Sequence, residues 1–443
     1  MPDALHYLSL SLCNVRAFGG RQVLDLSNDG KPSRWCVIIG ENGVGKTTVM
    51  QALAAMRPVP AFGPEESSEA TGKESSPPLW AEPVLTDYEN DRILSLVRRG
   101  DSVTTSLEAT LAGRDGEPLT IAYNIVTEGQ DLESAAPTRW ERELAGKGPF
   151  VIGYSAFRLP GHGNLNDIRN TEPTESLFDD TIGLLDPDEV VGDVDYNVLD
   201  ADRSGDKEAA ARWSAIQKRM TVAVAALIPG LSPDDVSLKG RDGIRIKTPS
   251  GDFPLAQLSF GAQTTVAWVL DLAWRLCNKF DKSPNPFEES AIVLIDEVEL
   301  HLHPRWQRSL RKELLSHFPN IQFIVTTHAP VTAQESVAAG DPISIVRWEG
   351  DHAVIVPDPF PRARVRLDEV ATELFELETS LPMRLEEMLR ERRELIRKDE
   401  LNDEEKARLL ALNEVARAVR TGSATSEADV EQLMAAVPDL AQS

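Results

Sequence analysis

Apolar and polar positions recur along the chain with two periodicities, which predict strands and helices. Residues 7–26 and 103–126 show a period of two around glycine-containing turns, which predicts antiparallel hairpins. Short apolar runs predict buried strands, at residues 35–40, 151–157, 291–296 and 321–328. Segments with a period of about 3.6 predict helices, at residues 46–56, 206–228, 261–280 and 305–318.

The order of these elements indicates an α/β fold. Strands alternate with helices in the second half of the chain, which predicts a mostly parallel sheet with an antiparallel part. Two further hairpins are predicted at residues 242–255 and 343–357. No internal repeat and no sustained heptad pattern is present, so the chain is not expected to contain a long coiled coil.

Breaker residues mark the segments between these elements. Residues 57–85 and 159–205 are rich in proline, glycine and polar residues, which predicts a flexible loop and an irregular insertion. From residue 366 onward the pattern predicts a helical tail. Asn402 and Glu405 stand at the two positions of a capping box for its last helix.

Composition limits the classes of partner. The 443 residues carry a formal net charge of -25, so the overall field does not favour nucleic acid, and any such contact needs a local basic patch. The three cysteines are far apart, which is typical of a reducing compartment. The first residues do not resemble a signal peptide, and no apolar run approaches the ~20 residues that cross a bilayer. We therefore expect a cytoplasmic protein without membrane contact.

A glycine-rich loop follows the predicted strand 35–40. The segment GENGVGKTT, from Gly40 to Thr48, matches the phosphate-loop (Walker A) pattern. Its glycines allow backbone N–H groups to converge on phosphate oxygens, and Lys46 adds a positive charge. The hydroxyl of Thr47 is a ligand for Mg²⁺. We expect the nucleotide-binding residues to be Asn42, Gly43, Val44, Gly45, Lys46, Thr47 and Thr48.

Two carboxylates end the predicted strand 291–296. Asp296 and Glu297 follow a run of five apolar residues. Beside a phosphate loop, an Asp in this position holds Mg²⁺ together with Thr47. The adjacent Glu can act as the general base that activates the attacking water. The sequence therefore predicts an ATPase that uses ATP and Mg²⁺, with Glu297 as a catalytic residue.

Two more segments complete a resemblance to ABC-type ATPases. LSFGAQ, residues 258–263, is similar to their LSGGQ signature, with Phe260 and Ala262 as departures. The resemblance implies that Ser259 and Gly261 bind the γ-phosphate of a nucleotide held by a second protomer, so that a homodimer or higher oligomer forms composite sites. It also implies that His328, at the end of the predicted strand 321–328, is the switch histidine. Arg158 would replace the glutamine that senses the nucleotide.

The branch of the family is indicated by longer segments. LSLCNVRAFGG near the start resembles the RecF, SMC and OLD-type branch. AIVLIDEVELHLHPRWQ is similar to predicted bacterial ATPases of antiphage defence, of the Septu and retron-associated type. The resemblance implies an ABC-type head with a mixed sheet, an antiparallel β lobe and a helical insertion. Residues 1–365 would form the ATPase domain, with insertions at 57–150 and 159–230, and residues 366–443 a tail that docks a partner.

The resemblance also implies a separate effector. OLD-type proteins carry a nuclease with a D-x-D cluster after the ATPase, and this chain has none after His328. We therefore expect no nuclease in this chain and a regulatory role over a partner such as an HNH nuclease. A RecF-type repair or chromosome-maintenance ATPase that binds DNA directly is the alternative. A transporter motor is disfavoured by the long interval between the phosphate loop and the signature.

Other residue groups allow two interpretations. His301 and His303 could bind zinc or iron with Glu299 as a third ligand, although the resemblance places them in a loop that crosses the dimer interface. Basic residues of two predicted helices could contact nucleic acid or a partner, or form solvated faces. These residues are Arg305, Arg308 and Lys312 in the first helix, and Arg384, Arg390, Arg392, Arg393, Arg397 and Lys398 in the tail.

Overall fold

The computed structural model divides the chain into two compact units, Met1–Val365 and Arg366–Ser443. The structure describes residues 5–60, 79–81, 96–98, 103–113, 118–128, 131–137, 148–161, 165, 172–228, 230–239, 243–357, 383–396, 398 and 402–421. In this described part of the chain, no helix combines the length and the apolar character needed to cross a membrane.

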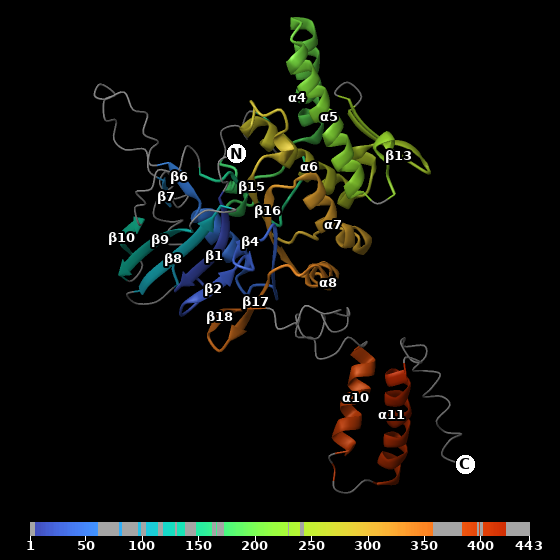
Figure 1. Ribbon diagram of the computed structural model, residues 1–443. Coiled ribbons are helices and arrows are strands. Elements are labelled where there is room, and N and C mark those ends of the chain that lie inside the picture. The colour runs from blue at the N-terminus through green and yellow to red at the C-terminus, as the bar shows by residue number, and fades with distance from the viewer. Residues whose placement is uncertain are drawn as a thin grey trace. The chain divides into compact units, whose positions relative to one another are not determined.

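A six-stranded mixed sheet forms the centre of the first unit (Figure 1). Its order is β11-β15-β16-β5-β17-β18, and all neighbours are parallel except the last pair. The strands are β5 Trp35–Gly40, β11 Val151–Tyr154, β15 Ala291–Ile295, β16 Ile321–Thr327, β17 Ile343–Glu349 and β18 His352–Pro357. Strands β5, β11, β15 and β16 are buried along their whole length, as their uninterrupted apolar runs predict.

An antiparallel sheet forms a second layer, in the order β10-β9-β8-β1-β2. These strands are β1 His6–Cys13, β2 Gln22–Asp25, β8 Val103–Ala112, β9 Leu119–Glu128 and β10 Asp131–Pro137. Helix α1, Lys46–Ala55, contributes Val49, Met50 and Leu53 to a core that it shares with both sheets. Short two-stranded ladders join β3 Ser27–Asn28 to β4 Lys31–Pro32 and β6 Pro58–Pro60 to β7 Leu79–Ala81.

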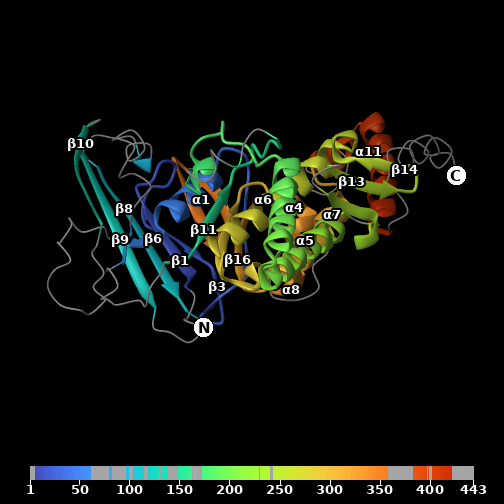
Figure 2. The same cartoon turned by 90° about the horizontal axis from the view of Figure 1, so that it is seen from above.

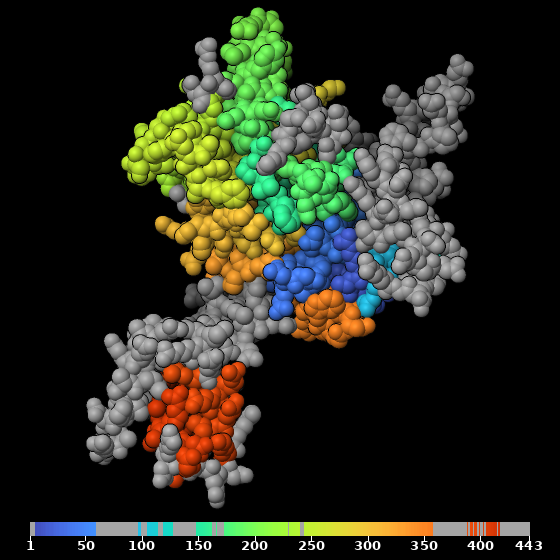
Figure 3. Space-filling model, turned by 180° about the vertical axis from the view of Figure 1, so that it is seen from behind, coloured from blue at the N-terminus to red at the C-terminus, as the bar shows by residue number. Residues whose placement is uncertain are grey.

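Helices cover the other face of the mixed sheet (Figure 2). They are α6 Phe260–Lys279, α7 Pro304–His317 and α8 Pro330–Ala339. The α4–α5 hairpin, Pro187–Ser204 and Lys207–Leu227, packs on α6 and projects from the rest of the unit (Figure 3). A small sheet lies at its base, with β12 Val236–Lys239, β13 Gly243–Thr248 and β14 Gly251–Pro254. The mixed sheet, the antiparallel lobe and the helical layer confirm the predicted α/β fold class.

Helix α4 corrects the predicted irregular insertion of residues 159–205. Asp186 caps the helix by accepting a hydrogen bond from the backbone of Asp188, and Pro187 occupies its first turn. Val190, Val191 and Val194 are buried on one face. The many Asp and Asn residues of the segment hid this apolar stripe, because their helix propensity is low, and packing of the buried valines outweighs that propensity.

The second unit contains α10 Met383–Ile396 and α11 Asp403–Thr421, which pack together. The predicted capping box is confirmed: the Asn402 backbone donates to the Glu405 carboxylate at 3.0 Å, and the Glu405 backbone donates to the Asn402 side chain at 2.8 Å. Most of the predicted loop 57–85 and part of the tail lie outside the described residues.

Candidate functional site

The carboxyl ends of four parallel strands bring the predicted site residues to one edge of the mixed sheet. The strand registers pair Tyr154 with Ile295, Ile295 with Val325, and Thr327 with Ile39. Each predicted site segment begins directly after one of these paired residues: the phosphate loop after Ile39, the Asp296–Glu297 turn after Ile295, and His328 after Thr327. Ligand sites of open α/β sheets lie at this edge, because the loops that leave the strands gather there.

The phosphate loop has the backbone that a nest of N–H groups requires. Gly43 and Gly45 have φ values of 79° and 109°, in the left-handed region that only glycine adopts readily. A Cβ on Gly45 would also lie 3.0 Å from the Phe18 ring. Asn42 and Val44 lie within this loop, and Thr48 lies in the first turn of α1. The loop therefore fits a phosphate chain at the N-terminus of α1.

Lys46 is 6% exposed, and its ammonium donates to the carbonyls of Gly40 at 3.0 Å and Glu41 at 2.8 Å. Burial lowers the pKa of Lys46, and the carboxylates of Asp296, Glu297 and Glu299 oppose that shift. The amine thus stands between the loop and the acidic turn, where a phosphate would add negative charge.

The predicted metal ligands are adjacent. The Thr47 hydroxyl donates to Oδ2 of Asp296 at 2.6 Å, so these two oxygens can enter the coordination shell of one Mg²⁺. Asp296 is 4% exposed. Its other oxygen, Oδ1, accepts a hydrogen bond from the Thr326 hydroxyl. Asp296 is therefore held on both sides by threonine hydroxyls.

Glu297 and His328 face each other. His328 Nε2 lies 3.6 Å from Glu297 Oε1. Nε2 is buried and has no hydrogen-bond partner among the described residues, and the same holds for Oε2 of Glu299. Burial, followed by the charge of Lys46, lowers the pKa of His328 below its ordinary value, which favours the neutral imidazole. These two unpaired buried atoms indicate a polar ligand at this edge.

Arg158 lies beneath the acidic turn. It donates to the backbone carbonyls of Ser155, Asp296 and Glu297, at 3.0, 2.5 and 2.7 Å. Burial lowers its pKa from the ordinary range of arginine to about 10. These contacts connect the segment after β11 to the Asp296–Glu297 turn, and the predicted role of Arg158 in sensing nucleotide stays a prediction.

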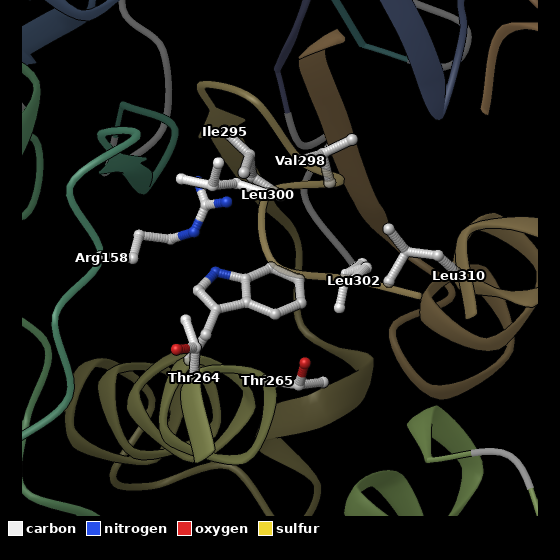
Figure 4. Close-up of a pocket in the computed structure, with 9 residues that line it drawn as sticks. Arg158, Thr264, Thr265, Ile295, Val298, Leu300, Leu302 and Leu310 are labelled. Atoms are coloured by element: carbon white, nitrogen blue, oxygen red, sulfur yellow. The ribbon is translucent and has the colours of Figure 1, made fainter. Parts of the chain in front are cut away.

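A small cavity of about 20 Å³ borders Arg158 (Figure 4). Thr264 and Thr265 reach it from α6, Leu300 and Leu302 from the segment after the acidic turn, and Leu310 from α7. Trp268 also lines it, and its indole N–H is buried without a hydrogen-bond partner among the described residues. The space is large enough for one water molecule.

The signature segment begins α6. Ser259 is its N-cap and accepts a hydrogen bond from the Ala262 backbone at 3.4 Å. Gly261 needs to be glycine, because a Cβ there would lie 2.2 Å from the His301 carbonyl oxygen. Phe260 packs edge-on against the His301 ring, with centroids 4.8 Å apart. The signature segment is thus in contact with the segment that follows Glu297.

The two histidines of that segment have structural partners. His303 caps α7 by accepting a hydrogen bond from the Arg305 backbone at 3.2 Å. His301 has a left-handed backbone with φ 66° and the contact to Phe260 just described. Within the described ranges, no group of three or more His, Cys, Asp or Glu side chains is placed to hold a metal ion.

The sequence pattern did not identify Arg16 or Thr326 at this edge, and it indicated Glu299 only as a possible metal ligand. Arg16 donates to Thr48 at 3.5 Å and to Gln51 at 2.5 Å on α1. Glu299 accepts a hydrogen bond from the backbone N–H of His328. Thr326 bonds both residues of the acidic turn. Each is far from its partners along the chain, so no local pattern could have found it.

Sequence comparisons find similarity to an AAA-domain family and to curated retron and Septu proteins. The family model described as "AAA domain, putative AbiEii toxin, Type IV TA system" matches residues 195–333. "Retron Ec83 probable ATPase" of Escherichia coli is 51% identical over 74 residues, which are 17% of this chain and 14% of that protein. "Septu protein PtuA" of Bacillus mycoides (strain KBAB4) is 27% identical over 304 residues, which are 67% of this chain and 34% of that protein.

Solved structures with a similar chain path include the "SMC head domain from Thermotoga maritima". It has 18% identity and a TM-score of 0.41, and the match covers 80% of this chain and 100% of that one.

The matched segments span about a third or less of the curated relatives named above. The sequence matches confirm the predicted resemblance to ABC-type ATPases tied to antiphage defence.

Proposed function

We propose that this protein binds and hydrolyses ATP with Mg²⁺ and acts as a switch. One observation carries the proposal: the phosphate loop, the Thr47–Asp296 pair and the Glu297–His328 pair lie at one sheet edge. Hydrolysis needs a positive charge that binds the phosphates, oxygen ligands that hold the metal ion, and a general base that activates water. All three kinds of group are present there.

Each residue has a defined role in this proposal. The N–H groups of the loop and the Lys46 ammonium bind the phosphates. Thr47 and Asp296 would hold Mg²⁺, which would supply positive charge beside the phosphoryl oxygens. Glu297 accepts a proton from the attacking water. Neutral His328 donates a hydrogen bond towards the γ-phosphate from Nε2, which has no hydrogen-bond partner in the part of the chain that the structure describes.

The second half of each site comes from another copy of the chain in this proposal. Ser259 and the N-terminus of α6 present an anion-binding group at the surface, where Phe260 is 45% exposed. Their contact with the His301 segment connects the signature to the chain's own catalytic turn. A homodimer with two shared sites is supported by this arrangement.

The switch would control a separate effector in the cytoplasm. The names of the retron and Septu relatives support a defence role, and an HNH nuclease is the effector class that we expect. The tail would dock the effector, because Ile396 and Leu410 of the second unit are 53% and 58% exposed. We expect no nuclease activity from this chain alone.

A second candidate function, direct binding of nucleic acid, is favoured by α7. Arg305, Arg308 and Lys312 are exposed and recur at helical spacing, with no ion pair to any described residue. Such a stripe could contact a phosphate backbone despite the net charge of -25. Wild-type binding to duplex DNA that weakens with salt would support this candidate.

Calorimetry tests the main proposal. Lys46→Ala should abolish ATP–Mg²⁺ binding, while Lys282→Ala, which removes an exposed lysine, should bind like wild type. Unchanged affinity in Lys46→Ala would refute the assignment of the loop. For the effector, co-purification with neighbouring gene products and a mass measurement should give a complex that Ile396→Ser with Leu410→Ser weakens.

A further inference from the structure

A buried hydroxyl connects the two carboxylate residues of the catalytic turn. Thr326 lies on β16, next to β15, and is fully buried. Its Oγ1 donates to Oδ1 of Asp296 and accepts the backbone N–H of Glu297 at 2.7 Å. One side chain thus uses both its donor and its acceptor on consecutive residues of the turn.

The turn needs such a partner because its backbone is unusual. Glu297 has a φ of 49°, in the left-handed region that a residue with a side chain seldom adopts. A non-glycine residue stays there only when its surroundings hold it. Four hydrogen bonds do so. The Glu297 N–H donates to the Thr326 hydroxyl and the Val298 N–H to the Thr326 carbonyl at 3.0 Å. The Glu297 carbonyl accepts from Arg158 and from the Leu300 N–H at 2.9 Å.

The same hydroxyl sets the direction of the Asp296 carboxylate. With Oδ1 bound to Thr326, Oδ2 points to the Thr47 hydroxyl at 2.6 Å. Without the Thr326 hydroxyl, the carboxylate could rotate and the Glu297 peptide could relax. The metal ligand and the base would then lose their orientation together.

We propose that Thr326 is a positioning residue for hydrolysis, which orients Asp296 and Glu297 through one hydroxyl; this inference rests on the proposed ATPase function. Thr326 itself does not touch the nucleotide in this role. Its effect is therefore on the catalytic rate and on the use of Mg²⁺, while the phosphate loop keeps its affinity for ATP.

The chain offers a matched control on the same strand. Thr327 is the next residue, is equally buried, and uses its hydroxyl to accept the Ala329 backbone N–H at 3.0 Å. Thr327→Val removes a buried hydroxyl without touching the catalytic turn. Thr326→Ser keeps the hydroxyl and loses only a methyl group.

Steady-state kinetics give the first readout. Thr326→Val should lower kcat by about 10- to 100-fold, as expected when a hydrogen bond to a charged group is lost. The Mg²⁺ concentration for half-maximal rate should rise, while the Kd for ATP stays within about threefold. Thr326→Ser should recover most of the rate, and Thr327→Val should stay near wild type.

Amide hydrogen exchange gives a readout that needs no ATP. The Glu297 amide should exchange about tenfold faster or more in Thr326→Val, and should keep its wild-type rate in Thr327→Val. Unchanged exchange at Glu297 in Thr326→Val would overturn the inference, as would an equal loss of kcat in both valine variants.

The failures of the two proposals can be told apart. A wild-type chain without ATPase activity overturns the proposed function and the role of Thr326 together. An active wild type with an equally active Thr326→Val overturns the role of Thr326 alone.

Discussion

Replacing Arg158 by methionine should destabilise the first unit without leaving a cavity at the site of the side chain. The substitution removes a buried guanidinium that donates to three backbone carbonyls, those of Ser155, Asp296 and Glu297. Methionine is long and apolar enough to fill most of the same space. The loss therefore reports on the hydrogen bonds more than on packing.

The magnitude follows from two opposing effects. Leaving a buried carbonyl without its donor costs about 1–3 kcal/mol, which applies to Ser155 and Asp296. The Glu297 carbonyl keeps the backbone N–H of Leu300 at 2.9 Å, so its loss is closer to about 1 kcal/mol. Against this, the guanidinium no longer has to be buried, which recovers roughly 3 kcal/mol, because burial lowers its pKa to about 10. A net loss of about 2 kcal/mol in the free energy of unfolding is expected.

Urea titration followed by tryptophan fluorescence measures this loss in the first unit alone. All eight tryptophans lie within Met1–Val365, so the tail does not contribute to the signal. With a slope of roughly 3 kcal/mol per molar, the midpoint should fall by about 0.7 M. Arg308→Met, an exposed arginine on α7, serves as the control and should shift the midpoint little.

An Arg158→Met midpoint equal to that of Arg308→Met would show that the Arg158 hydrogen bonds do not stabilise the first unit. Arg158→Lys should lie between, because an ammonium lacks the fork that reaches consecutive carbonyls. In the same variants, ATP hydrolysis should fall more than ATP binding, since the peptide between Asp296 and Glu297 is what Arg158 holds.

Three further predictions concern the catalytic groups. Glu297→Gln should bind ATP but hydrolyse it about 10²-fold more slowly. A wild-type rate in this variant would exclude Glu297 as the general base. Asp296→Ala should instead lose Mg²⁺-dependent binding of ATP. Because burial and Lys46 lower the pKa of His328, hydrolysis should stay level around neutral pH and fall only on the acidic side of the ordinary histidine range, as the imidazole gains a proton. An acidic limb that persists in His328→Gln would assign that limb to another group. Mixing Ser259→Arg with Lys46→Ala chains should restore part of the ATPase activity, because the heterodimer has one site with neither lesion; heterodimers without recovery would count against shared sites.

Local chemistry let the sequence predict the strands, the fold class and most residues of the candidate site. The phosphate loop and the Asp296–Glu297 pair are each contiguous, and each follows an apolar run that can only be buried. Parallel strands then place their carboxyl ends at one edge. Helix α4 escaped this reasoning because its acidic residues masked a stripe of three valines, whose burial depends on α5 and α6.

Tertiary structure alone decided which side chains hold the site in place. Arg158, Thr326 and Glu299 reach partners that lie 138, 30 and 29 positions away along the chain. A single arginine or threonine in a sequence is chemically ordinary, and its role depends on which backbone groups fall within about 3 Å of it. The sequence by itself determined which groups can do the chemistry, through contiguous motifs, whereas folding determined how they are oriented, because distant strand ends share one edge.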